Sequence, residues 1–367
     1  MISNKNIIFY SDISSILSQK RALAIQSLGY NVFCISPKLE KDIPNLTIYS
    51  LNIKQYPPLF RECIFIIFFI FHFIRIKPKC IHIHWAAIGL QGVLLMYLSP
   101  LVVTVMGGDV LEDQGQLTVF RKWCLRRLLK KAKAVTVKSE FLGKEVEKYG
   151  VSQDKTHVIN WGVDVDLINT ISVSHITKNL LYKDKFILFS PRLCQPLYNI
   201  DKIIESYLVF EKQCPDSLLL ISEFMADARY LRLLKKKVVS SGLDQKILFL
   251  GAIAWNDMIG YYKVSDSVVS IPDSDGFPQT IIEAMACGCF PIIGDLPQYS
   301  EHIQNKTSGL LVDFNKENRL ADAFEWVYYH ATDVNDIVKK NINYCKDTFC
   351  SIEQLKHLDM IYQEVLE

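Results

Sequence analysis

Short apolar runs alternate with helix-forming segments along this chain, and this alternation limits the possible fold more than any other feature. The expected strands of the first half are residues 6–10, 31–36, 80–85, 101–106 and 134–137, and those of the second half are 186–190, 217–222, 246–250, 267–271 and 290–293. Strands that are apolar throughout and separated by helices are typical of parallel sheets covered on both faces. The pattern therefore predicts an α/β fold of two doubly wound domains, each binding ligands at the carboxyl ends of its strands.

The length of 367 residues also fits two domains. We expect residues 1–168 to form the first and residues 169–350 the second, with the polar stretch 166–185 as a linker. Residues 1–168 contain 21 Lys and Arg against 13 Asp and Glu, whereas the rest of the chain contains 20 against 26. A basic first half favours an anionic surface or acceptor as its partner.

The ten cysteines are scattered, and their spacing predicts neither a zinc site nor a secreted disulfide framework. We therefore expect reduced thiols and a cytoplasmic protein. The first ten residues lack the apolar region and cleavage site of a signal peptide, which agrees with this expectation.

The stretch 274–288 carries two carboxylates around the turn Gly276-Phe277-Pro278. Asp275 lies on the turn, and Glu283 follows about two helical turns later. The amides near Gly276 and Phe277 and the N-terminus of the helix favour a bound anion. A phosphate between two carboxylates that bind hydroxyl groups fits a nucleotide sugar, and an ordinary acidic helix N-terminus is the alternative.

This stretch resembles the carboxylate-x7-carboxylate signature of the retaining glycosyltransferases of family 4, whose GT-B fold has two Rossmann-like domains facing across a cleft. The resemblance implies that Glu283 holds the nucleotide ribose and that Asp275, where the family usually has Glu, holds the donor sugar. It also implies that the amphipathic segment 351–367 crosses back onto the first domain. Further motifs follow in the family's order: Gly29-Tyr30-Asn31-Val32, 158–164, Ser190-Pro191-Arg192-Leu193, Gly251, Tyr261-Tyr262 and Ser265-Asp266.

Arg192 stands where the family has its phosphate-binding Arg. A guanidinium there can bind the diphosphate and offset charge on the leaving nucleotide, and a surface salt bridge is the alternative. The Lys that most relatives carry a few residues later is absent. We expect Tyr198 and Asn199, or else Lys202, to bind the phosphates in its place.

The candidate catalytic residues, besides Asp275, lie in the first half. Asp109 can accept a hydrogen bond from the acceptor hydroxyl or instead cap its own turn; many relatives have His at the nearby Met106. His84 ends an expected strand and can contact the acceptor or the sugar, whereas we expect His82 to be buried and hydrogen-bonded. The two histidines share one face of that strand, but they are a weak zinc motif without a third ligand. We expect neither a metal nor a cofactor.

Other parts of the first half bear on the acceptor and on membranes. The loop 11–15 corresponds to a Gly-rich loop that lines the acceptor cleft in relatives, but it lacks glycine. The apolar run 63–74 is shorter than the about 20 residues of a spanning helix, so it is either buried or partly inserted into one leaflet.

The basic amphipathic helix expected at Arg121–Lys133 suits an anionic membrane surface, although it can also be a solvated face. Its charged stripe consists of Lys122, Arg126, Lys130 and Lys133. We do not expect nucleic acid as a partner, because no nucleic-acid-binding motif accompanies the helix.

Together these features predict a cytoplasmic hexosyltransferase, peripheral to the inner face of the cell membrane. It would transfer a sugar, with retention of configuration, from a UDP- or GDP-sugar to a lipid-linked or polysaccharide acceptor. A sugar-nucleotide epimerase with the GT-B fold and a non-catalytic partner subunit that binds nucleotide sugar or lipid are the alternatives.

Overall fold

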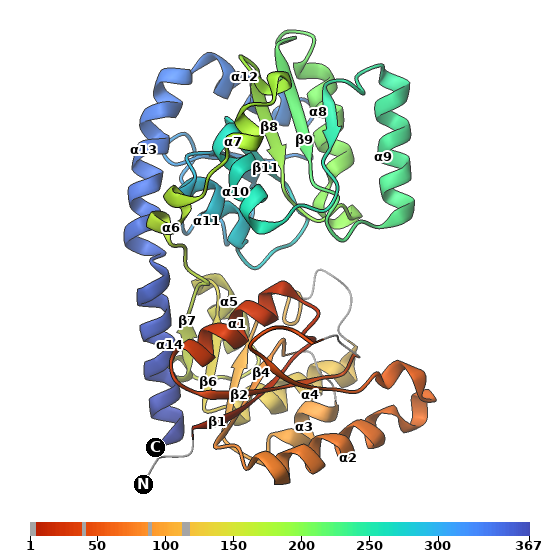
Figure 1. Cartoon of the computed structure of the whole chain (residues 1–367), viewed down its shortest axis with the longest axis vertical. Coiled ribbons are helices and arrows are strands. Elements are labelled where there is room, and N and C mark those ends of the chain that lie inside the picture. The colour runs from red at the N-terminus through yellow and green to blue at the C-terminus, as the bar shows by residue number, and fades with distance from the viewer. Residues whose placement is uncertain (1–4, 39–41, 87–89, 112–117) are drawn as a thin grey trace. The chain divides into compact units, whose positions relative to one another are not determined.

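The computed structural model describes residues 5–38, 42–86, 90–111 and 118–367, which belong to two compact units (Figure 1). The first unit comprises residues 1–160 and 352–367, and the second comprises residues 161–351. The division after Asn160 lies earlier in the chain than the expected division after Ile168.

The first unit is built on a seven-stranded parallel sheet with the strand order β3-β2-β1-β4-β5-β6-β7. The order reverses between β1 and β4, so the loops that follow these two strands leave the same edge of the sheet and diverge. Ligands of doubly wound sheets bind at such a point. The strands are β1 (Asn6–Tyr10), β2 (Asn31–Ser36), β3 (Thr47–Ser50), β4 (Cys80–His84), β5 (Leu101–Thr104), β6 (Ala134–Val137) and β7 (Thr156–Val158).

Helices cover both faces of this sheet, which is why its central strands are apolar throughout. One face packs against α2 (Pro58–Ile76), α3 (Leu90–Leu95), α4 (Val119–Lys131) and α5 (Glu140–Glu147). The other face packs against α1 (Ile16–Ser27) and α14 (Ser351–Leu366). The helix α14 thus contributes to the core of the first unit. No helix in the described part of the chain is long and apolar enough to span a membrane.

The second unit contains a six-stranded parallel sheet with the order β10-β9-β8-β11-β12-β13. Its reversal point lies between β8 and β11. The strands are β8 (Phe186–Ser190), β9 (Ser217–Ile221), β10 (Ile247–Phe249), β11 (Ser267–Ser270), β12 (Phe290–Gly294) and β13 (Leu310–Val312). The helices are α6 (Val165–Thr170), α7 (Ser174–Thr177), α8 (Ile200–Phe210), α9 (Ala228–Ser241), α10 (Trp255–Val264), α11 (Gln279–Ala286), α12 (Arg319–Tyr329) and α13 (Ala331–Thr348). Two parallel Rossmann-like sheets confirm the predicted fold class.

The stretch 166–185 does not behave as the expected linker. Most of α6 and all of α7 lie within it, and Ile168 and Ile176 are buried. Ile176 lies so close to Gly260 of α10 that a Cβ added to this glycine would come within 2.4 Å of its Cδ1. A few apolar side chains therefore fix a segment whose composition is mostly polar.

Candidate active site

Two predicted donor-binding residues of the second unit are in direct contact. Arg192 follows β8, Asp275 follows β11, and these strands are neighbours in the sheet. Nη2 of Arg192 donates to Oδ2 of Asp275 at 2.6 Å, and Nη1 donates to Oγ1 of Thr280 at 3.2 Å. Both charged side chains are largely buried. The reversal point of the sheet thus places a guanidinium and a carboxylate where α11 begins.

The surroundings keep Arg192 charged and Asp275 fixed in orientation. Burial alone would lower the pKa of Arg192, but Asp275, Tyr198 and Tyr299 raise it above its usual range. The ring of Tyr198 lies 4.6 Å from the guanidinium carbon, which adds a cation–π contact. Asp275 also accepts hydrogen bonds from the Tyr299 hydroxyl at 3.1 Å and from the Gly276 amide at 2.7 Å.

The turn between Asp275 and α11 is anchored by an aromatic side chain. Phe277 has a φ of 77°, a conformation that a bulky residue keeps only when its surroundings impose it. Its ring is buried and lies 4.6 Å from that of His302. Pro278 then occupies the position just before α11, without a side-chain capping hydrogen bond. The ring of Phe277 therefore serves packing, and the predicted donor contact, which concerns its amide, stays a prediction.

Glu283 lies on α11 apart from the Arg192–Asp275 pair. Its Oε1 accepts hydrogen bonds from Nε1 of Trp255 at 3.2 Å and from Nε2 of Gln279 at 3.5 Å. Thr280, which contacts Arg192, is three residues before Glu283 and so shares its helix face. The Arg192–Asp275 pair consequently lies at the start of α11, and the carboxylate of Glu283 lies in the middle of the same helix.

The three residues expected to replace the missing Lys are separated in the structure. Tyr198 lies against Arg192. Asn199 is buried and uses its side-chain amide to hold the loop after β11, because Nδ2 donates to Ile271 O at 3.0 Å and to Asp273 Oδ1 at 2.8 Å. Lys202 donates to Asn315 at 3.0 Å. Of the three, Tyr198 is therefore the one in contact with the guanidinium.

Asp109 in the first unit is fully buried and ties two loops together. Its carboxylate accepts hydrogen bonds from the amides of Ala86 at 2.8 Å, Gly107 at 2.9 Å and Met106 at 3.0 Å. Burial raises the pKa of Asp109, and these amides only partly offset the increase. The carboxylate fixes the loops after β4 and β5 relative to each other, and its predicted contact with an acceptor stays a prediction.

A cavity of about 420 Å³ opens at the carboxyl ends of the central strands of the first unit. Its lining residues are Tyr10, Ser11, Asp12, Ser15, Leu17, Ser18, Pro37, His84, Trp85 and Met106. Trp85 has a φ of 87° and is 43% exposed as a residue, so a strained backbone conformation leaves this large aromatic residue partly open to solvent. The sequence indicated His84 here but not Trp85, which was only expected to be the last residue of the strand 80–85.

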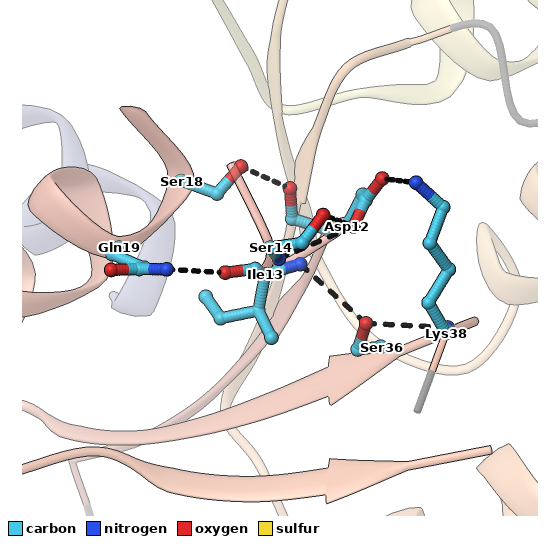
Figure 2. A network of polar contacts seen from close by, with 8 residues as sticks. Asp12, Ile13, Ser14, Ser18, Gln19, Ser36 and Lys38 are labelled. Atoms are coloured by element: carbon cyan, nitrogen blue, oxygen red, sulfur yellow. Dashed lines mark hydrogen bonds and ion pairs between the residues drawn. The ribbon is translucent and has the colours of Figure 1, made fainter. Parts of the chain in front are cut away.

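Side chains fix the loop 11–15, which borders this cavity (Figure 2). Asp12 forms an ion pair with Lys38 and accepts a hydrogen bond from the Ser14 hydroxyl at 2.6 Å. The Ser11 and Ser18 hydroxyls are 2.7 Å apart, and Nε2 of Gln19 donates to the carbonyl of Ile13. Burial alone would raise the pKa of Asp12, but its hydrogen bonds to Lys38 and Ser14 lower it below the usual range. Serine and aspartate contacts thus shape a loop that lacks glycine.

His82 is buried and hydrogen-bonded, as predicted. Its Nε2 lies 2.7 Å from Oγ1 of Thr104, and its Nδ1 contacts the hydroxyl of Tyr362 on α14. Burial, with a smaller effect of Arg21, lowers the pKa of His82 to about 3. Burial also lowers the pKa of His84 well below its usual value. Among the described residues, no three His, Cys, Asp or Glu side chains are grouped to hold a metal ion.

Family models match both units. Residues 20–167 match the model described as Glycosyltransferase Family 4, and residues 174–343 match the model described as Glycosyl transferases group 1. The two matches follow one another and together span most of the chain. The chain belongs to the group 1 glycosyltransferases. Its two parallel Rossmann-like sheets agree with the GT-B fold of this family.

Two curated relatives match this glycosyltransferase over part of their length. Mannosylfructose-phosphate synthase of Agrobacterium fabrum is 29% identical over 153 residues, which are 39% of this chain and 33% of that protein. D-inositol 3-phosphate glycosyltransferase of Pseudarthrobacter chlorophenolicus is 25% identical over 193 residues, which are 50% of this chain and 44% of that protein. The glycosyltransferase thus covers less than half the length of either relative.

Solved structures match nearly the whole glycosyltransferase in fold. Sucrose-phosphate synthase from Thermosynechococcus elongatus has a TM-score of 0.83 at 18% identity, with 98% of this chain and 99% of that chain covered. Anabaena HepE in complex with UDP-glucose has a TM-score of 0.82 at 15% identity, with 98% of this chain and 99% of that chain covered. A glycosyltransferase from Rickettsia africae has a TM-score of 0.80 at 19% identity, covering 100% of this chain and 99% of that one.

Proposed function

We propose that this glycosyltransferase is a hexosyltransferase that uses a UDP- or GDP-sugar as donor and a lipid-linked or polysaccharide acceptor, with retention of configuration. The observation that carries the proposal is the Arg192–Asp275 pair at the start of α11, with Glu283 further along the same helix. Arg192 and the amides of Gly276 and Phe277 would bind the diphosphate, and Glu283 the ribose. The complex of Anabaena HepE with UDP-glucose supports a nucleotide sugar as the donor class.

The proposed transfer breaks the bond between the anomeric carbon and the diphosphate oxygen and forms a bond from that carbon to the acceptor oxygen. The acceptor proton passes to the departing phosphate, so the step needs no enzymic base. Arg192 offsets the negative charge that develops on the leaving group. Asp275, oriented by Tyr299 and the Gly276 amide, would hold a hydroxyl of the donor sugar.

The cavity of the first unit is the proposed acceptor site. Its volume of about 420 Å³ lies within the range of small-ligand sites. His84 and Trp85 contribute to its lining, and Asp12 and the serines of the loop 11–15 offer groups that hydrogen-bond to sugar hydroxyls. These features support an acceptor that presents a sugar ring to the enzyme.

We further propose a cytoplasmic location at the inner face of the cell membrane, without a metal requirement. The basic residues of α4 support this location, because Arg121, Arg126 and Lys130 are exposed; Lys133, which was expected in this helix, is also exposed but follows its end at Lys131.

Nucleotide binding tests the donor site. We expect UDP or GDP, at about a hundred times its Kd, to stabilise the wild-type protein by about 2.7 kcal/mol in a thermal-shift experiment. Glu283→Ala should lose most of this response, while Glu317→Ala, an exposed glutamate of the second unit, should retain it. An equal response of Glu283→Ala and wild type would contradict the assignment.

Turnover then separates the proposed function from its rivals. With donor and acceptor together, mass spectrometry should show glycosylated acceptor and free nucleoside diphosphate. A donor that changes without acceptor would indicate an epimerase, and a donor that binds but stays intact with every acceptor would indicate a non-catalytic subunit.

A further inference from the structure

The helix α2 is apolar on two opposite faces, although only one of them packs in the core. Phe65 and Phe69 are fully buried against the sheet. On the opposite side Ile67, Phe71 and Ile74 are 69%, 60% and 65% exposed, and their spacing places them in one stripe. With Phe60 and Ile70, which are also exposed, they form what we call the outer ridge of α2. A helix that is apolar all round is normally buried, so this ridge lacks the cover that its composition calls for.

Exposed apolar residues also occur on and beside the helices next to α2. Figure 1 shows α3 and α4 next to it, and α3 contacts both of the other helices. The exposed apolar residues of this region are Leu90, Leu94, Tyr97, Val119, Phe120 and Trp123. Contiguous exposed apolar patches mark interaction sites in soluble proteins.

Exposed basic residues accompany these apolar residues. Exposed basic residues lie at the end of α2 and along α4, namely Arg75, Lys77, Arg121, Arg126, Arg127, Lys130 and Lys131. The Arg127 guanidinium lies 5.3 Å from the centre of the Trp123 ring, and the Lys131 ammonium lies 5.9 Å from that of Tyr97. Cations and aromatic rings thus occur as neighbours at the border of the apolar patch.

Exposed negative charge is missing from the described residues of the same stretch. Within 58–111 and 118–133 the acidic residues are Glu62, which is half-buried, and Asp109, which is fully buried. An apolar centre with a mainly basic border among the described residues is complementary to anionic phospholipid, in which acyl chains lie beneath phosphates. A second copy of the chain fits less well, because a twofold interface would place the basic borders against each other.

We infer that the outer ridge of α2 inserts into the surface of an anionic phospholipid bilayer while the basic residues of α4 bind its phosphates. The inference rests on the proposed function for its biological setting, since a lipid-linked acceptor lies in a membrane, but its observations come from the first unit alone. The helix lies on the bilayer without spanning it, because no described helix is long and apolar enough to span.

Vesicle cosedimentation of the full-length protein, without donor, tests the ridge. We expect binding to vesicles of equal parts phosphatidylglycerol and phosphatidylcholine, and much less to phosphatidylcholine alone. The triple variant Ile67→Asn, Phe71→Asn, Ile74→Asn should bind at least on the order of tenfold more weakly. The control variant Leu233→Asn, Val239→Asn changes exposed apolar residues of α9 in the second unit and should bind as wild type.

A second pair of variants tests the charges. Arg126→Ser with Arg127→Ser should weaken binding by on the order of fivefold per charge and reduce its salt dependence. Arg232→Ser with Lys236→Ser, on the basic face of α9, is the matched control. The inference would be overturned if the wild-type protein did not bind anionic vesicles, or if the ridge variants bound them as tightly as the wild type.

Two further measurements keep the outcomes distinct. Light scattering of the wild type should give a monomer mass; a dimer that the ridge variants dissociate would overturn the inference in favour of self-association. Circular dichroism and the nucleotide-dependent thermal shift should be unchanged in the ridge variants, because the ridge is exposed and the proposed donor site lies in the second unit. If the wild type bound no nucleotide, this would instead contradict the proposed function, while the result of the vesicle experiment would be unaffected.

Discussion

At the scale of single residues, the candidate donor site depends on a buried ion pair whose members are held by other side chains. The guanidinium of Arg192 reaches Asp275 and Thr280 with two different nitrogens. A buried charge that loses its partner is costly, by about 3 kcal/mol or more. The pair therefore orients both groups before any ligand arrives, which is the condition under which a charge stabilises a transition state best.

Replacing Arg192 by Lys separates geometry from charge. The ammonium of Arg192→Lys keeps the ion pair with Asp275 but lacks the planar fork that also reaches Thr280. We expect kcat to fall on the order of tenfold to a hundredfold, with a smaller change in thermal stability. Steady-state kinetics of Arg232→Lys, an exposed arginine of α9, provides the control. Unchanged kcat in Arg192→Lys would show that the fork does not matter for transfer.

The sequence could indicate Arg192, Asp275 and Glu283 but not their contacts. Arg192 and Asp275 are 83 positions apart, and the order of strands that makes β8 and β11 neighbours is a property of the whole sheet. Tyr299 and Trp255 stand in no recognisable motif, and they reach the carboxylates only through the packing of the elements that carry them. Side chains whose position depends on tertiary packing leave no local signal.

At the scale of elements, the buried strands were the predictable ones. The bounds expected for residues 6–10 and 31–36 agree with β1 and β2, because a strand covered on both faces is an uninterrupted apolar run. The strands that the sequence did not indicate are β3, β7 and β13, each at the edge of a sheet. An edge strand has one neighbour and partial exposure, so short segments such as 47–50 and 156–158 contain polar residues and lack the pattern.

The structure explains why the motif at 158–164 contains a glycine at position 162. The segment 161–164 passes the end of α13 there. Gly162 has a φ of 74°, and a Cβ there would lie 2.5 Å from Cα of Ser351. We expect Gly162→Ala to destabilise the second unit by clearly more than the about 1 kcal/mol of the backbone conformation alone.

Gly242→Ala separates the two effects on Gly162. Gly242 has a φ of 72° with nothing within 4 Å of an added Cβ, so this variant carries the conformational cost without the clash. Urea unfolding of both variants measures the difference. Equal losses of unfolding free energy would mean that the contact with Ser351 relaxes at no cost.

At the scale of the whole molecule, the chain crosses between the units twice, after Asn160 and after Ser351. Within the second unit the two crossing segments are hydrogen-bonded to each other, since the Val163 amide donates to Phe349 O at 2.6 Å and the Ser351 amide donates to Val163 O at 3.1 Å. The second unit thus closes on itself, whereas the first unit needs α14 from the other end of its sequence.

This difference predicts how fragments behave. A fragment of residues 161–351 should fold and keep its nucleotide-dependent thermal shift, because Arg192, Asp275 and Glu283 all lie within it. Residues 1–160 alone should not fold stably, because the sheet face that α14 covers would be exposed and His82 would lose Tyr362. Joining residues 352–367 to Asn160 through a flexible linker should restore folding. Circular dichroism melts of the three fragments, with and without nucleotide, provide the measurement. Cooperative melting of 1–160 without α14 would mean that the helix adds little to the first unit. A nucleotide response that is lost in 161–351 would mean that donor binding also needs the first unit.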